Sequence, residues 1–442
     1  MGGRLKIDAL NLAQLQDGMR WVPDPWVSVW QQAEPRGRLQ QMEVSWTGSV
    51  QQPKIGQWKA QAVDVSLRAG SVSKAHPRAP WPGLSGLTAS LSGTASEIQG
   101  HVRLEPGVFH WPGLWEDAQK NIRGLEADVR MQLTAQNSRV QLQGARLMVD
   151  QGQLSMDADW QGTPSDPLGR LEMTAHAPEL EASQIANWLP LDIPSSVRDY
   201  VKAAIPQGRV QSVQAKVSGR LADFPFERAG AGEFRISAQL ADVKFLTLPK
   251  ALMDAHETGE WPTFQSLSGR LLFDRASLKL DKVKARLVGA PNVNWSLLEA
   301  DIRNLSQGVV NVRAQGRGPL NEMLGWWKSS PLNEWTDRVL SASRSQGVAD
   351  YRIQLSIPIQ KPESTQAQGS VVFGGNELAI APGAPTLTKV KGGLRFNEAG
   401  FELNGVQASL WGGDVRLEGG AKPVAHPAPQ VWIRAQIGRA HV

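Results

Sequence analysis

Residues 125–160, LEADVRMQLTAQNSRVQLQGARLMVDQGQLSMDADW, decide the fold class. In 125–133 every odd position is apolar and every even position is charged or polar, and apolar residues again occupy every second position at 140–142, 147–149 and 154–160. A period of two places successive side chains on opposite faces of an extended strand. The segment therefore predicts successive strands, each with one apolar and one polar face.

The connections between these runs are too short for crossover helices, which favours antiparallel pairing. Glycine and proline number 43 and 28 among the 442 residues and are spread along the chain, as many short strands with frequent turns require. We predict an all-β, mainly antiparallel fold with more than 45% strand and roughly 25 strands. The one-sided strands could form sandwiches, a β-helix, or a trough with an apolar concave side.

Three short helices interrupt the alternation. We expect them near residues 22–31, 195–204 and 332–340, the last preceded by Trp326 and Trp327. In the second segment, Ser195 or Ser196 is a suitable N-cap residue. Helices this few and this short cannot cover the apolar face of so many strands.

Two internal repeats indicate a modular chain. Residues 35–48 (PRGRLQQMEVSWTG) align without gaps to 206–219 (PQGRVQSVQAKVSG), and each copy follows a predicted helix. Residues 267–287 align without gaps to 390–410, with Phe273 matching Phe396. Repeats of strands predict an extended sheet built from similar units. We expect modules at 1–170, 171–319 and 320–436, with Phe273 and Phe396 on the same face.

Composition excludes several functions. A net charge of +5 over this length, with basic and acidic residues interleaved, does not favour nucleic-acid binding. The absence of cysteine excludes disulfides and thiolate metal sites. The seven histidines lack ligand-like spacing, and Asp157 and Asp159 fit a solvated strand face better than an acid–base pair. The sequence thus predicts no catalytic residue, metal or cofactor.

The ends of the sequence carry two expectations. Residues 437–442 (IGRAHV) match one reading frame of a common sequencing adapter, so we interpret them as an assembly scar. The natural protein would then continue beyond residue 436. The sequence contains no run of 18 or more apolar residues, so it predicts no helix that spans a membrane.

A broader pattern resembles a known family. It comprises the helix, Pro-x-Gly and strand units, the segment 219–226 (GRLADFPF), Gly232-Glu-Phe234, Trp261-Pro262, and Leu-x-Gly-x-Leu-x-Phe ending at Phe273. Together these resemble a middle portion of the YhdP family of the AsmA-like superfamily, which also includes TamB-type proteins. The resemblance covers roughly residues 10–436.

The resemblance implies a fold and a role. The fold would be an elongated, repetitive, curved sheet, a taco-like β-groove with a few short helices between modules. The full-length protein would be anchored in the inner membrane of a Gram-negative bacterium, with its β-structured body in the periplasm. Its groove would pass phospholipid between the inner and outer membranes without enzymatic activity, nucleic acid or cofactor; no oligomeric state is predicted.

The expected groove lining consists of the alternating apolar residues. These are Leu125, Val129, Met131, Leu133, Leu147, Val149, Leu154, Met156, Leu171, Met173, Leu271, Phe273, Leu278, Leu280, Leu394, Phe396, Phe401 and Leu403.

Two other functions compete with lipid transfer. An envelope assembly scaffold could hold outer-membrane proteins by adding their strands to an open sheet edge. A β-helical polysaccharide enzyme is less favoured, because no carboxylate cluster recurs at a fixed place in the repeats. The seventeen tryptophans fit packing, groove edges or sugar platforms, and those near helix starts, such as Trp188, fit packing best.

Overall fold

Strands make up more than half of the chain. The computed structural model describes residues 2–15, 24–49, 54–72, 79, 81–150, 152–191, 193–228, 230–253, 261–330, 333, 338, 340–359, 361, 364–397, 400–422 and 430–437. Within them the strands are β1 (Gly2–Ile7), β2 (Leu10–Asn11), β3 (Arg36–Thr47), β4 (Lys54–Leu67), β5 (Gly83–Gly93), β6 (Glu97–Leu104), β7 (Gly107–His110), β8 (Gln119–Ile122), β9 (Gly124–Leu133), β10 (Ser138–Val149), β11 (Gly152–Thr163), β12 (Asp166–Glu181), β13 (Gln207–Arg220), β14 (Gly232–Leu246), β15 (Thr263–Asp274), β16 (Ser277–Leu287), β17 (Asn294–Ile302), β18 (Val309–Pro319), β19 (Arg344–Gln346), β20 (Val348–Pro358), β21 (Gln366–Ala379), β22 (Leu387–Asn397), β23 (Gly400–Leu410), β24 (Gly413–Lys422) and β25 (Gln430–Ile437). The predicted strand content is confirmed.

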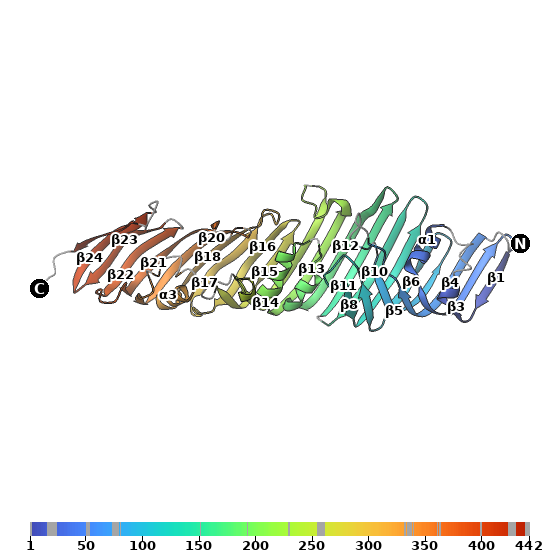
Figure 1. The fold of residues 1–442 in the computed structure, drawn as a ribbon, viewed down its shortest axis with the longest axis horizontal. Coiled ribbons are helices and arrows are strands. Elements are labelled where there is room, and N and C mark those ends of the chain that lie inside the picture. The colour runs from blue at the N-terminus through green and yellow to red at the C-terminus, as the bar shows by residue number, and fades with distance from the viewer. Residues whose placement is uncertain are drawn as a thin grey trace. The chain divides into compact units, whose positions relative to one another are not determined.

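The described strands, 25 in number, are assigned to one sheet, and every pairing with a described register is antiparallel. Most strands pair with their sequence neighbours through short turns, as Figure 1 shows. The predicted all-β antiparallel class is therefore confirmed. A parallel β-helix, one of the arrangements left open by the sequence, does not fit these registers.

The chain divides into two compact units, which are described separately. Unit 1 comprises residues 1–202 and 210–238, and unit 2 comprises 203–209 and 239–442. The division falls inside the helix Ser195–Ala204 and inside β13 and β14 rather than in a linker. The three predicted modules are not tested by this division and stay a prediction.

Helices are short and few in the described part of the chain. They are α1 (Asp24–Ala33), α2 (Ser195–Ala204) and α3 (Leu320–Ser329), with the 3-10 turns η2 (Ala182–Trp188), η3 (Leu221–Asp223) and η4 (Lys250–Leu252). The first two predicted helices are confirmed. The third prediction, 332–340, lies largely outside the described residues. The structure places a further helix, α3, before it, and Trp326 and Trp327 lie inside α3.

Both repeats recur in the backbone geometry. Gly37 and Gly208, equivalent in the first repeat, have φ values of 136° and 131° and open β3 and β13 just after α1 and α2. In the second repeat, Ser266 and Lys389 both have φ 51°, and Lys282 and Gly405 have φ 54° and 59°. The repeats are thus equivalent strand segments, and in the second repeat the kinks of the hairpin recur as well.

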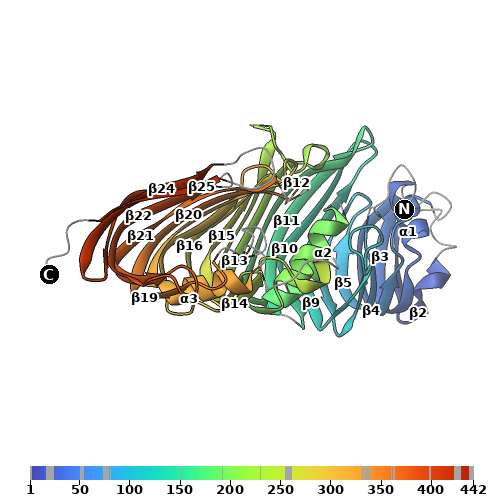
Figure 2. The same ribbon diagram turned by 60° about the vertical axis from the view of Figure 1, so that its left-hand side comes forward.

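Each unit has its own hydrophobic core. In unit 1, Leu39, Leu87, Leu104 and Val149 are buried together, and Trp30 of α1 and Trp188 of η2 pack against them. In unit 2, the cluster around Leu287, Tyr351 and Val390 includes Leu320 of α3, with Met323 and Trp326 packed on it. Figure 2 shows α3 lying across the ends of the unit 2 strands beside β19.

Candidate functional site

One face of unit 1 is apolar across five neighbouring strands of the sheet, β6, β9, β10, β11 and β12. Register places four rows of directly opposed side chains on this face, which we call inner face 1. The rows run Ile98–Met131–Val140–Trp160–Leu171, Gly100–Val129–Leu142–Ala158–Met173, Val102–Ala127 with Ala145–Met156–Ala175, and Leu104–Leu125–Leu147–Leu154. Paired residues share a face, so alternation within each strand becomes a continuous apolar surface from β6 to β12.

The opposite face of unit 1 is polar and held by ion pairs. Asp159 accepts hydrogen bonds from Arg139 and, at 2.9 Å, from Nε2 of Gln141. The Arg139 guanidinium holds the pKa of the Asp159 carboxyl below its usual value. A hydrogen bond from Ser218, with help from Arg170 at 2.7 Å, lowers the pKa of Glu172 in the same way. The outer face is therefore a polar surface suited to contact with water. The apolar character of inner face 1 needs a separate explanation.

A β-bulge separates a covered end of inner face 1 from a barer end. In β10 the register shifts between Leu142 and Ala145, where Gly144 has φ 59° and donates its N–H to Oδ1 of Asp157 at 2.8 Å. On one side of the bulge lies Val149, which is 5% exposed and belongs to the core. On the other side Val140 and Leu142 are only half-buried. A bulge bends its strand and increases the local twist, so the side chains on the two sides of the bulge point in different directions.

The corresponding face of unit 2, inner face 2, has the same construction. Its rows are Leu271–Leu280–Ala300–Val312–Leu355–Ala367, Phe273–Leu278–Ile302–Val310–Ile357, and Leu298–Ala314–Ile353–Gly369–Phe396–Phe401. Because β20 is free of register shifts, these rows put Phe273 and Phe396 on one face. That prediction from the repeats is confirmed.

Inner face 2 is also divided by bulges. The shifts lie at Ser266 in β15, Lys282 in β16, Lys389 in β22 and Gly405 in β23. On the α3 side of them are the buried core residues, and on the far side the rows above are mostly half-buried. Burial raises the pKa of Tyr351, which lies within the core and donates its hydroxyl to the carbonyl of Gly318 at 3.3 Å.

The structure places all eighteen predicted lining residues on the two inner faces, but not all in the same environment. Val149 is a buried core residue, and Leu125, Leu147, Leu154, Leu394 and Leu403 pack against the cores. The other twelve are half-buried and lie away from the cores: Val129, Met131, Leu133, Met156, Leu171, Met173, Leu271, Phe273, Leu278, Leu280, Phe396 and Phe401. Val149 lies on the face that the alternation predicted, but neighbouring segments cover it, so it is part of the core.

Several inner-face residues were missing from that set. Ile98, Val102, Val140, Leu142 and Trp160 occupy the same rows as the predicted ones. Their signal was present, since each stands in an alternating run of its own strand. In β6 the run EIQGHVRL is weakened by Gly100, which hides the pattern.

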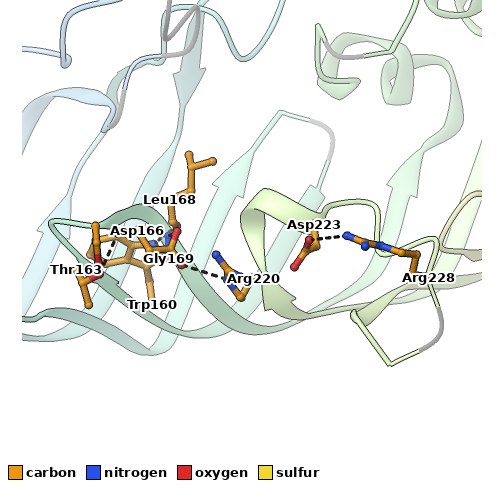
Figure 3. Close-up of polar contacts among 9 residues, drawn as sticks. Trp160, Thr163, Asp166, Leu168, Gly169, Arg220, Asp223 and Arg228 are labelled. Carbon is orange, nitrogen blue, oxygen red and sulfur yellow. Dashed lines mark hydrogen bonds and ion pairs between the residues drawn. The ribbon is translucent and has the colours of Figure 1, made fainter.

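The barer end of inner face 1 finishes at the β11–β12 turn, shown in Figure 3. Near this turn, Trp160 of inner face 1 donates its indole N–H to the carbonyl of Leu168 at 2.8 Å. Asp166 in the turn accepts from Nε of Arg220, at the end of β13, at 3.2 Å. Asp223 of η3 pairs with Arg228 at 3.3 Å. The β11–β12 turn and the segment at the end of β13 therefore carry charged side chains, whereas inner face 1 itself is apolar.

Unit 1 also has a hollow whose lining includes carboxylate side chains. A hollow of about 430 Å³ on unit 1 is lined by side chains of β10 to β13, among them Asp157, Asp159 and Lys216. Asp157 accepts the N–H of Gly144 in the bulge, and Asp159 forms an ion pair with Arg139, so the two carboxylates do not form an acid–base pair. Among the described residues no group of His, Cys, Asp or Glu is placed to hold a metal ion.

Comparison with protein families identifies this architecture. The family model described as YhdP protein matches residues 2–435, nearly the whole chain. The chain belongs to the YhdP family. Searches of curated proteins and of solved structures give no match. In the described part of this YhdP-family chain, none of the helices combines the length and apolar content needed to cross a bilayer.

Proposed function

We propose that this YhdP-family chain is a non-enzymatic lipid-transfer segment whose two inner faces carry the acyl chains of phospholipid. The observation that supports the proposal most is the extent of half-buried apolar surface beyond the bulges. Soluble proteins rarely leave contiguous apolar patches of several hundred Å² without a partner. Each methylene that such a surface shields from water is worth about 0.8 kcal/mol.

The register supports a continuous path within each unit. On inner face 1, apolar side chains follow one another from β6 to β12 without a charged residue in the four rows. A chain lying across the strands would contact side chains such as Val129, Leu142 and Met173 in turn. These rows do not form the polar trough that would favour the scaffold function. Passage between the inner and outer membranes of a periplasm is part of the proposal, and membership of the YhdP family supports it.

The test is photocrosslinking from neighbouring positions with opposite orientation. Benzoylphenylalanine in place of Met131 lies on inner face 1, and in place of Gln132 it lies on the exposed outer face of the same strand. In cells, we expect a phospholipid adduct, identified by mass spectrometry, from Met131 and none from Gln132. Lipid adducts from both positions, or protein adducts alone from Met131, would reject the proposal, and the latter would favour the scaffold.

A further inference from the structure

We propose, on the basis of the proposed function, that residues 182–191 are a movable cover over the core end of inner face 1. We call this segment the strap. In its closed position the strap keeps one row of apolar side chains inside the unit 1 core. In its open position the same row joins the surface that lipid can reach.

The strap crosses one end of the unit 1 sheet. It begins directly after β12, beside the start of β11. Its other end reaches the loop between β7 and β8, where the backbone N–H of Leu191 donates to the carbonyl of Leu114 at 2.9 Å. The end of β8 lies beside the end of β10, because the N–H of Arg123 donates to the carbonyl of Met148 at 2.8 Å. Between its two attachments the strap therefore passes the ends of β11 and β10.

The row that the strap covers is the same kind of surface as the accessible rows. Trp188 of the strap packs against the unit 1 core together with Leu125, Leu147 and Leu154. These three leucines are directly opposed across β9, β10 and β11, in the row that follows Met156. Without the strap, the row would extend the half-buried apolar surface of inner face 1 to the end of the strands. Its side chains belong to a closed core or to an open path according to the position of the strap.

An aromatic latch holds the far end of the strap. The rings of Trp115 and Trp188 meet edge to face with their centroids 5.4 Å apart, and the indole N–H of Trp115 donates to the carbonyl of Trp188 at 3.1 Å. Lys120, paired with Asp117 at 3.5 Å, lies over the Trp188 ring at 5.9 Å from its centroid. Trp115 and Trp188 both lie outside the strands. Their contact can therefore break without breaking the ladder of the sheet.

The strap is less well packed than the strands beside it. Most of it is the 3-10 helix η2, which has no side-chain hydrogen bond at its N-cap, and within η2 only Ala182 is buried. The rest of the strap is half-buried or exposed, with Leu191 40% exposed. Hydrogen bonds in 3-10 helices have poorer geometry than those in α-helices. Segments with few buried contacts open at a lower free energy than the core, so the strap should open while the sheet stays folded.

Reversible locking tests this movement. Because the chain has no cysteine, Leu114→Cys and Leu191→Cys can be joined by a short bis-methanethiosulfonate and released by dithiothreitol. Benzoylphenylalanine in place of Leu154 reports what lies under the strap, and in place of Met131 it reports what lies on the accessible rows. The purified full chain is incubated with vesicles of phosphatidylethanolamine and phosphatidylglycerol and irradiated, and the adducts are identified by mass spectrometry.

We expect lipid adducts from position 154 in the released protein and their loss in the locked protein, with adducts to the strap peptide instead. Position 131 should give lipid adducts in both states. Met148→Cys with Gln153→Cys, an exposed and directly opposed pair on the outer face, is the crosslinked control and should change neither result. Leu147 provides a second position under the strap should the Leu154 variant fold poorly.

The two proposals fail in different ways. Unchanged adducts from position 154 on locking, or an equal loss caused by the control crosslink, would overturn the strap as a movable cover while position 131 still binds lipid. Absence of lipid adducts from position 131 in both states would overturn the proposed function itself.

Two single substitutions test the latch without a crosslink. Trp115→Phe keeps an aromatic ring but removes the N–H that bonds the strap, so lipid adducts from position 154 should increase. Trp111→Phe is the matched control, because its indole N–H donates at 2.7 Å to the carbonyl of Ala79, outside the strap. An equal increase with both variants, or none with Trp115→Phe, would show that this contact does not hold the strap closed.

Discussion

Introducing a charge at a buried position and at a half-buried position of inner face 1 should have very different costs. Val149 and Met156 share inner face 1 and lie on the same side of the β10 bulge, but Val149 is 5% exposed in the core, whereas Met156, next to the bulge, is half-buried. Val149→Asp loses the burial of a whole valine side chain, about 2 kcal/mol. It also leaves an unpaired carboxylate in the core, at several kcal/mol. We expect a total loss of roughly 5 kcal/mol or more, enough to unfold unit 1.

Met156→Asp should cost much less, because water can reach the new carboxylate. About half of the methionine burial is lost, which corresponds to roughly 1 kcal/mol. Binding of lipid, in contrast, should fall strongly, since an acyl chain would have to desolvate the charge. The sequence alone suggested Asp157→Lys as an outer-face control, but Asp157 accepts the bulge N–H of Gly144. Gln153→Asp, on the exposed outer face of β11, is the better control.

Urea unfolding with hydrogen exchange of β10 and β11 measures the stabilities, and mass spectrometry of co-purified lipid measures the binding. The expected order of stability is Gln153→Asp close to wild type, then Met156→Asp, then Val149→Asp. Equal destabilisation by Met156→Asp and Val149→Asp would refute the division of the face into covered and accessible ends. Normal lipid content in a folded Met156→Asp variant would show that this part of the face does not carry lipid.

Three further outcomes follow from specific contacts. Asp157→Ala should lower the free energy of unfolding of unit 1 by about 1 kcal/mol, by removing the acceptor for Gly144 N–H; an unchanged urea midpoint would contradict this role. Gly162→Ala should cost about 1–3 kcal/mol by displacing the Trp160 ring, whereas Gly374→Ala, whose added Cβ would meet nothing closer than 3.6 Å, should be nearly neutral in thermal unfolding. Because the pKa values of Asp159, Glu172 and Asp281 are lowered in the folded state, their stabilising contribution is present above about pH 4 and lost as the pH falls through the folded values; Asp159→Asn should make the acid-side slope shallower in pH-dependent urea titrations.

The alternation in residues 125–160 predicted the strands and their apolar face, because a period of two determines which side chains of a strand share a face. It could not predict which part of that face is closed. Closure of Val149 depends on distant segments, including Trp188 of η2, that pack against the same cluster. The bulge at Gly144 was equally hidden, since the extra residue merely interrupts the pattern between Leu142 and Leu147. The helix Leu320–Ser329, which the sequence analysis did not predict, follows Pro319, a residue well suited to the start of a helix.

The barer ends of the inner faces are not needed to hold the sheet together. Backbone hydrogen bonds run the length of the paired strands on both sides of the bulges, and burial is concentrated where the cores lie. Polar residues at Val140, Leu142 or Met173 would keep the same ladder and would cost little burial. Apolar side chains at those positions therefore add little to folding and raise the risk of aggregation. They are accounted for if an apolar ligand covers them for much of the protein's lifetime.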